Sequence, residues 1–143
     1  MVKQFRALLM SSLVLTLLVG GTACKKVKED LARRFIISAM TDGRWLVDKF
    51  TEDTEDITAS FSGYEFQFKE DGKVYAVLGA SQEEGTWVGD VNALTIFSNF
   101  PGATAPLSGL NDTWKITNNT TKLVEAEPVN PARKAYLKLV KKN

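Results

Sequence analysis

The sequence predicts a mainly β protein: an eight-stranded antiparallel up-and-down barrel preceded by one N-terminal helix. Three observations favour this fold. From residue 43 onward, apolar and polar residues alternate in short runs that are separated by turn-forming residues. The connections between those runs alternate between tight turns and longer loops. Only residues 25–40 of the remaining chain show the spacing of an amphipathic helix.

The length and charge of the chain set the first limits. At 143 residues it supports one domain with a core large enough to fold without disulfides. The first 23 residues contain Lys3 and Arg6 but no acid, so the remainder carries 16 basic against 17 acidic side chains. This balance gives no reason to expect nucleic acid or anionic lipid as the main partner.

Two residue counts exclude whole classes of chemistry. The chain has no histidine, which rules out Ser-His and Cys-His catalysis and His-ligated zinc. It has one cysteine, Cys24, so neither an internal disulfide nor a thiolate cluster can form. We therefore expect no enzyme activity, no metal and no cofactor; a carboxylate-based activity is the remaining alternative.

The first 24 residues have the features of an export signal. Lys3 and Arg6 precede an apolar run of 13 residues at positions 7–19. A bilayer crossing needs about 20 residues, so this run is too short for one. Small residues at positions 20–23 then predict a cleavage site between Ala23 and Cys24.

This arrangement resembles a bacterial lipoprotein signal, in which the peptide is cut just before a cysteine that is then acylated. Thr22, Ala23 and Cys24 match that motif, whereas Gly21 stands where a leucine is usual. The resemblance implies palmitate-type acylation of Cys24 and attachment to a membrane of the cell envelope, with the outer membrane favoured. The domain would then face the periplasm or the cell surface. The alternative is that Cys24 is a free exposed thiol.

Residues 25–40 are predicted to form a helix that ends at Thr41-Asp42-Gly43, with Gly43 as a C-terminal cap. Val27, Leu31 and Phe35 recur at intervals of four, and Ala32, Ile36, Ala39 and Met40 widen this apolar stripe. We expect this stripe to pack against the domain's own core. A partner-binding or membrane-surface helix is the alternative.

Eight runs follow with the two-residue period of strands. They are residues 43–50, 64–69, 73–78, 85–89, 93–97, 112–117, 121–127 and 133–141.

The connections favour a barrel over a Greek-key sandwich. Tight turns are expected at 70–72, 90–92 and 118–120, and longer loops at 51–63, 98–111 and 128–132; only the loop at 79–82 is ambiguous. In an up-and-down meander, alternate connections lie at the same end. One end is therefore expected to be closed by hairpins and the other to be rimmed by long loops. The interior of such a barrel has room for side chains or one small ligand.

Residues 43–143 resemble the lipocalins, and more closely the small lipocalin-like lipoproteins of Gram-negative bacteria. Gly43-Arg44-Trp45 matches the G-x-W signature, and Leu110-Asn111-Asp112-Thr113-Trp114 matches an L-N-D-x-W segment. A GYEFQFKEDGKV-type hairpin (63–74) and a G-T-W segment (85–87) lie between them. The resemblance implies the barrel fold and a tendency to bind ligands, but no known substrate.

The chain departs from the lipocalin pattern at two places. Residues 118–120 lack the T-D-Y type motif, and the last strand ends in Lys141 and Lys142 without the arginine that usually covers the signature Trp. The resulting domain assignment is a lipoprotein-type signal peptide at 1–23, a lipid-anchored N-terminus and helix at 24–42, and a lipocalin-like barrel at 43–143.

Aromatic residues divide between the two expected ends of the barrel. Trp45, Phe68 and Trp87, with Leu139, are predicted to plug the hairpin end. At the loop-rich end, inward-facing aromatics are predicted to line a pocket for an apolar or amphipathic molecule. The candidates are Tyr64, Phe66, Phe97, Trp114 and Tyr136, with Phe50 and Phe100 nearby. The alternative for all of them is core packing.

Glu52, Asp53, Glu55 and Asp56 form an acidic cluster in the first long loop. Such carboxylates can bind calcium or perform acid–base chemistry. We expect a solvated lid instead, because their spacing matches no calcium-binding loop.

The sequence therefore predicts a lipid-anchored envelope protein that binds a small hydrophobic molecule. The alternative is a protein-binding or assembly module with a filled barrel, which uses the long loops and Phe100-Pro101-Gly102 as its contact.

Overall fold

The computed structural model describes residues 21–143, so the predicted signal peptide lies outside the described part except for Gly21, Thr22 and Ala23. The helix α1 spans Gly21–Thr41, and two short 3-10 helices span Thr58–Phe61 (η1) and Leu107–Leu110 (η2). The strands are β1 (Trp45–Glu52), β2 (Glu55–Asp56), β3 (Tyr64–Phe68), β4 (Lys73–Leu78), β5 (Ser81–Asp90), β6 (Thr95–Asn99), β7 (Asp112–Asn119), β8 (Leu123–Pro128) and β9 (Ala135–Lys141).

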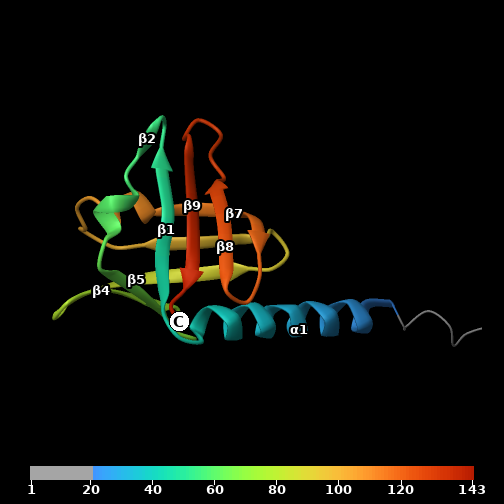
Figure 1. The fold of residues 1–143 in the computed structure, drawn as a ribbon. Helices are drawn as coiled ribbons and strands as arrows, with labels where there is room; N and C mark the ends of the chain where they lie inside the picture. Colours follow the sequence, from blue (N-terminus) through green and yellow to red (C-terminus); the bar gives the residue numbers. More distant parts are fainter. Residues whose placement is uncertain (1–20) are drawn as a thin grey trace, which may run out of the picture.

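The strands form a closed antiparallel barrel, as the sequence predicts (Figure 1). They follow one another in the order β2-β1-β3-β4-β5-β6-β7-β8-β9, and the pairing of β1 with β9 closes the ring. β2 lies outside the ring as the second half of a short hairpin on β1. The remaining eight strands make the up-and-down meander.

The two neighbours of β1 hold it unequally. β1 pairs with β9 at seven positions, from Trp45 opposite Lys141 to Glu52 opposite Ala135. It pairs with β3 at a single position, Trp45 opposite Phe66. Farther along β1, η1 takes the place of β3: the Ile57 N–H donates to the carbonyl of Phe50. We call this boundary the β1–β3 seam.

The loops alternate as expected, and the ambiguous connection at 79–82 is a tight turn between Leu78 and Ser81, which pair with each other. The hairpin end therefore holds the turns after β3, β5 and β7, and the loop-rich end holds β2, η1 and η2 (Figure 1). β5 starts four residues earlier than predicted because Gln82, Glu83 and Glu84 are exposed and polar yet still pair with β4.

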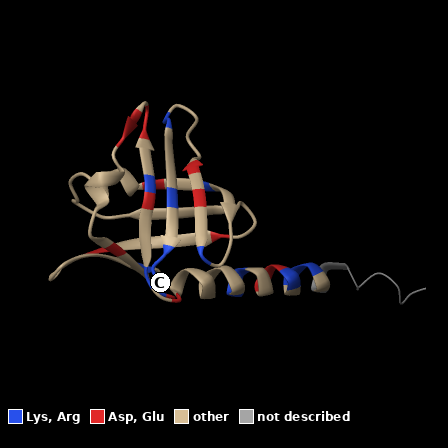
Figure 2. Ribbon diagram, in the orientation of Figure 1, with Lys and Arg blue, Asp and Glu red and all other residues tan. Residues whose placement is uncertain are grey.

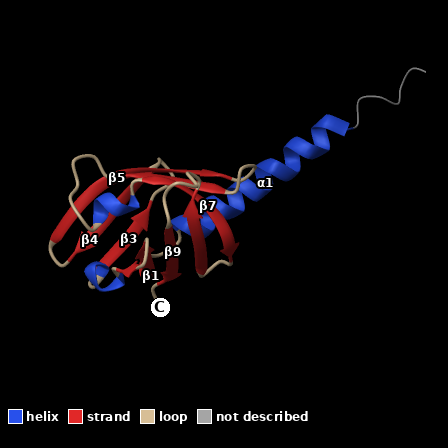
Figure 3. Cartoon of the chain, turned by 90° about the horizontal axis from the view of Figure 1, so that it is seen from above, coloured by secondary structure: helices blue, strands red, loops and turns tan. Residues whose placement is uncertain are grey.

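The helix α1 covers the hairpin end with its last turns only (Figure 3). Met40 is buried, and Ile36 and Ile37 pack on the core. Val27, Leu31 and Phe35 are exposed, so the prediction that this stripe packs against the domain core is wrong for these three residues. In residues 21–143, no helix has both the length and the apolar character needed to cross a bilayer.

Candidate functional site

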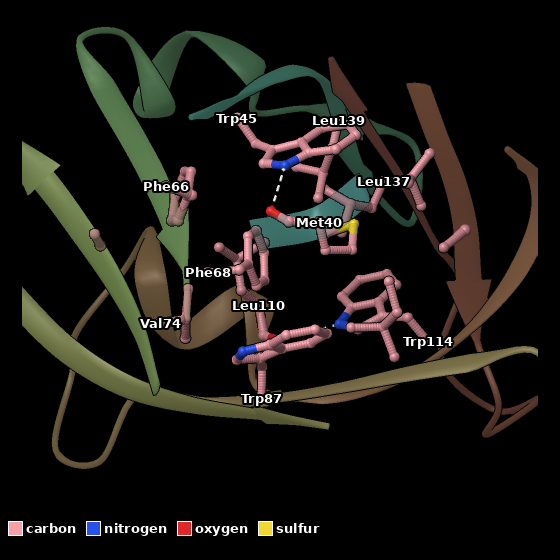
Figure 4. Close-up of a cluster of buried hydrophobic side chains, with 14 of the residues drawn as sticks. Met40, Trp45, Phe66, Phe68, Val74, Trp87, Leu110, Trp114, Leu137 and Leu139 are labelled. Carbon is pink, nitrogen blue, oxygen red and sulfur yellow. Dashed lines mark hydrogen bonds between the residues drawn. The ribbon is translucent and has the colours of Figure 1, made fainter. Parts of the chain in front are cut away.

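The interior of the barrel is filled by aromatic side chains in contact with one another. Phe50 contacts Phe61 and Trp114, with ring centroids 5.3 and 6.0 Å apart. Phe66 contacts Phe100 at 6.3 Å. Among the predicted pocket residues, Phe66 and Trp114 therefore do point into the barrel, where both are buried. Figure 4 shows them converging with the plug residues Trp45, Phe68, Trp87 and Leu139, all of which are also buried.

A small apolar cavity remains between these side chains. Its volume is about 30 Å³, and by the same measure one water molecule needs about 10–15 Å³. Pockets that hold drug-sized ligands measure roughly 300–1,000 Å³. The cavity lies between Phe66, Phe68, Val74, Ile96, Ser98, Phe100, Leu110, Trp114, Val124, Ala126, Leu137 and Leu139. In this conformation, the cavity is far smaller than the pockets that hold drug-sized ligands.

Both ends of the barrel are closed. At the loop-rich end, η1 inserts Phe61, and η2 inserts Leu107 and Leu110; all three side chains are buried. At the hairpin end, the indole Nε1–H of Trp45 donates to the carbonyl of Met40 at 2.9 Å and ties the end of α1 to the core (Figure 4). The long loops thus turn inward and seal the opening that they were expected to rim.

Two predicted pocket residues do not face the interior, which corrects the predicted site. Phe97 lies on the outer surface and is 39% exposed. Tyr136 also points outward and donates its hydroxyl to Glu125 at 2.6 Å. Burial, followed by the hydrogen bond to Glu125, raises the pKa of Tyr136 to about 12. Tyr64 is half-buried at the rim, where its ring stacks on Phe66. The five predicted residues therefore do not form one site.

The L-N-D-x-W segment has a structural role that accounts for most of its residues. Leu110 helps to close the loop-rich end, and its carbonyl accepts the Trp114 Nε1–H at 3.0 Å (Figure 4). Asn111 exchanges two hydrogen bonds with the backbone of Phe100, at 2.6 and 3.2 Å. These contacts hold the loop between β6 and β7 against the barrel.

Arg133, which no sequence pattern singles out, lies at the centre of the loop-rich end. Its guanidinium donates to Glu52 at 3.0 Å, to Asp112 at 2.8 Å and to the carbonyl of Gly109 at 2.7 Å. It also lies 5.1 Å from the ring centroid of Trp114. We call these five residues the Arg133 cluster. It joins β1, η2, β7 and the loop before β9, and no local sequence pattern predicts such a contact.

The acidic cluster in the first loop is divided between separate partners. Glu52 belongs to the Arg133 cluster, whereas Asp56 accepts from Lys49 at 2.5 Å and from the Thr58 hydroxyl. The hydrogen bond from Lys49, then that from Thr58, holds the pKa of Asp56 well below its usual range. Within residues 21–143, no group of three or more potential ligands is arranged to hold a metal ion. Asp53 and Glu55 are exposed at the tip of the β1–β2 hairpin.

An apolar patch lies outside the barrel, on the hairpin of β5 and β6. Val88 and Phe97 are opposite each other across the two strands, and both point to solvent. Leu94, in the turn of the same hairpin, is also exposed. We call these three residues the β5–β6 patch. By contrast, Phe100, which was expected to contribute to a protein contact, is buried and contributes nothing to the surface.

No protein-family model and no curated protein matches this chain. Among solved structures, the chain is similar to a DUF4847 family protein from Bacteroides vulgatus, with a TM-score of 0.53 at 16% sequence identity. The similarity covers 76% of this chain and 99% of that one. At this level of identity the comparison supports the small antiparallel barrel fold and nothing finer.

Proposed function

We propose that this protein is exported, is anchored to a membrane of the bacterial cell envelope through acylated Cys24, and uses its filled barrel as a protein-binding module. The size of the cavity is the observation that supports the protein-binding role. At about 30 Å³ it is roughly tenfold below the smallest common ligand pocket. A barrel that holds only its own side chains is suited to presenting a rigid outer surface.

The β5–β6 patch is the part of that surface best suited to a partner. Apolar side chains that project from a rigid sheet provide contact area without a large loss of conformational entropy. Val88 and Phe97 are held by a regular ladder from Thr86 opposite Asn99 to Asp90 opposite Thr95. The proposed contact is therefore a protein with a complementary apolar surface.

Site-specific photocrosslinking in the native host tests this contact. A photoreactive amino acid at Phe97 is expected to give one discrete crosslinked product, and the same probe at Thr117, exposed on the neighbouring strand β7, is expected to give none. Val88→Asp, which places a charge beside the probe, should abolish the product. The docking proposal fails if the products at 97 and 117 are the same, or if Val88→Asp leaves the product at 97 unchanged.

The anchor is tested separately. Cys24 is exposed on α1, so it is accessible to modification. Cys24→Ala should move the protein from the membrane fraction to the soluble fraction and should remove incorporation of labelled fatty acid. Unchanged fractionation together with unchanged labelling would refute acylation at this residue.

Binding of a small hydrophobic molecule is the second candidate, and the β1–β3 seam is the observation that favours it. A single pair of residues joins these strands, so this boundary can widen with the loss of few hydrogen bonds. Native mass spectrometry of the full protein purified from its host separates the two candidates. A mass that matches the acylated chain alone supports the filled barrel, whereas a bound molecule of constant mass supports the ligand.

A further inference from the structure

We infer that the outer part of α1 (residues 24–35) lies flat on an anionic lipid surface and immerses Val27, Leu31 and Phe35 in it. These side chains are 58%, 61% and 59% exposed, although each is large and apolar. The inference extends the proposed anchorage and rests on it for the presence of a membrane. It does not depend on whether the barrel binds a protein.

The stripe faces away from the barrel. An α-helix turns by about 100° per residue, so Val27 and Phe35 lie within about 40° of Leu31, whereas Met40 lies about 180° from it. Met40 is buried against the hairpin end. The same helix thus packs on the barrel along one face of its last turns and presents the apolar stripe on the other face. Figure 1 shows the N-terminal part of α1 extending beyond the barrel, where no described surface of the protein covers it. Phe35 lies nearer the barrel and lines a shallow pocket with Ile116 and Thr120, but 59% of it remains exposed.

The charges on the outer part of α1 match an anionic surface. Lys28 and Arg34 flank the stripe on opposite sides, each about 60° from Leu31. The acids Glu29 and Asp30 lie about 160° and 100° from it, away from the stripe. Lys and Arg predominate along this part of the helix, as Figure 2 shows. The nearly neutral charge of the whole chain conceals this local asymmetry.

Cys24 supports the choice of a lipid surface over a second protein. It is exposed and lies within about 20° of Leu31 on the same face of the helix. Acyl chains attached there would enter the bilayer from the side that already carries the apolar stripe. An apolar stripe flanked by basic residues is the pattern of helices that lie in the plane of a membrane interface. Immersion of this face would direct the loop-rich end and the acidic β1–β2 hairpin away from the bilayer.

An environment-sensitive fluorophore measures this immersion independently of acylation. The full chain with Cys24→Ser carries the probe at Val27→Cys on the stripe or, as a control, at Lys26→Cys, about 140° from Leu31. Both positions are exposed in the structure. In vesicles of phosphatidylglycerol and phosphatidylethanolamine, the probe at 27 should shift to the blue and be quenched by lipid-attached quenchers. The probe at 26 should do neither. Equal quenching at the two positions, or none at 27, would overturn the inference.

Charge reversal tests the role of the flanking residues. Each basic side chain near an anionic surface raises the bound fraction by about fivefold. Lys28→Glu with Arg34→Glu should therefore lower the immersed population at position 27 by about 25-fold or more. Lys25→Glu with Arg33→Glu makes the same change in net charge away from the stripe and should lower it far less. Equal losses in the two variants would refute the flanking role, and a blue shift at 27 without vesicles would indicate protein contact instead of lipid contact.

Failure of this inference differs from failure of the proposed function. If Cys24 is not acylated, Cys24→Ala leaves fractionation unchanged in cells, but the probe at 27 still reports immersion in vesicles. If α1 does not lie on lipid, the probe stays in water while Cys24→Ala still releases the protein.

Discussion

Lys141 covers the ring of Trp45: its Nζ atom lies 5.3 Å from the ring centroid, and its side chain is only 15% exposed. The resemblance to lipocalins implies an arginine in this role, and the chain lacks one there. Lys141, the last residue of β9, occupies this position over the ring, because Trp45 and Lys141 are opposite each other in the ladder that closes the barrel. The same amine lies 3.2 Å from Asp42, at the end of α1.

We expect Lys141→Ala to lower the free energy of unfolding by about 1 kcal/mol, because it removes a partly desolvated cation from an indole face. Lys141→Arg should retain most of this stability, since a guanidinium can occupy the same position. Lys122→Ala, at an exposed lysine in the turn between β7 and β8, is the control and should change little. Urea unfolding of the three variants measures the difference. Equal effects of the two alanine substitutions would refute the contribution of the cation–π contact.

The Arg133 cluster should stabilise the loop-rich end. Arg133→Met keeps much of the aliphatic length but leaves Glu52 and Asp112 without their shared cation. We expect a loss of about 2 kcal/mol, below the cost of breaking a fully buried pair because these side chains retain some solvent. Lys134→Met, at the exposed neighbour, should have almost no effect. Hydrogen exchange provides a local measurement: amides of η2 should exchange faster in Arg133→Met, and unchanged exchange there would contradict the role of the cluster.

Gly85 allows β5 and β6 to approach each other closely. A Cβ atom at this position would lie 2.6 Å from the carbonyl oxygen of Asn99 and 2.7 Å from the ring of Phe100. Gly85→Ala should therefore cost about 1–3 kcal/mol through overpacking. A Cβ at Gly109 would meet the ring of Phe50 at 3.5 Å, an ordinary contact, so Gly109→Ala is the matched control. Thermal unfolding should separate the two variants, and similar melting temperatures would show that the strands can move apart.

Tyr136 should make the protein less stable at high pH. Burial and the hydrogen bond to Glu125 raise the pKa of its phenol from 10.0 to about 12. The folded state therefore holds this proton more tightly than the unfolded state, so the contribution is complete below pH 10 and is lost between about pH 10 and pH 12.

Absorbance at 295 nm should resolve a phenol that ionises near pH 12, and Tyr136→Phe should remove that step. Glu125→Gln should lower the pKa of Tyr136, because it removes the negative charge that opposes ionisation. The interpretation would be wrong if the latest ionisation persisted in Tyr136→Phe.

The barrel was predictable because its strands alternate apolar and polar residues, and the turns carry glycine, aspartate and asparagine. The faces of individual residues were less predictable. Ile96 and Phe97 are both apolar, so the period of two does not decide which one points inward, and the structure places Ile96 inside. The predicted inward orientation of Tyr136 was wrong for a different reason. Leu137 and Leu139 lie on the inner face of β9, so the alternation of the strand itself places Tyr136 on the outer face.

The closure of the loop-rich end could not be predicted from periodicity. Phe61 and Leu107 lie in single turns of 3-10 helix, too short to show a repeat, and their partners are distant in sequence. Leu107 and Leu110, three residues apart after Pro106, are the only local hint of η2. Arg133 contacts a residue 81 positions away, Glu52, and nothing in either neighbourhood indicates that pairing.

The unequal pairing of β1 predicts an order for folding. The strand is held mainly by β9, which lies at the other end of the domain, and only at one position by β3. A chain synthesised from its N-terminus would therefore emerge with β1 unsecured and would acquire its main partner last. The meander from β3 to β8 can assemble by local hairpins in the meantime, and the ring closes in one step that joins the two ends of the domain. Truncation before β9 would leave β1 as an open edge, available to pair with another chain.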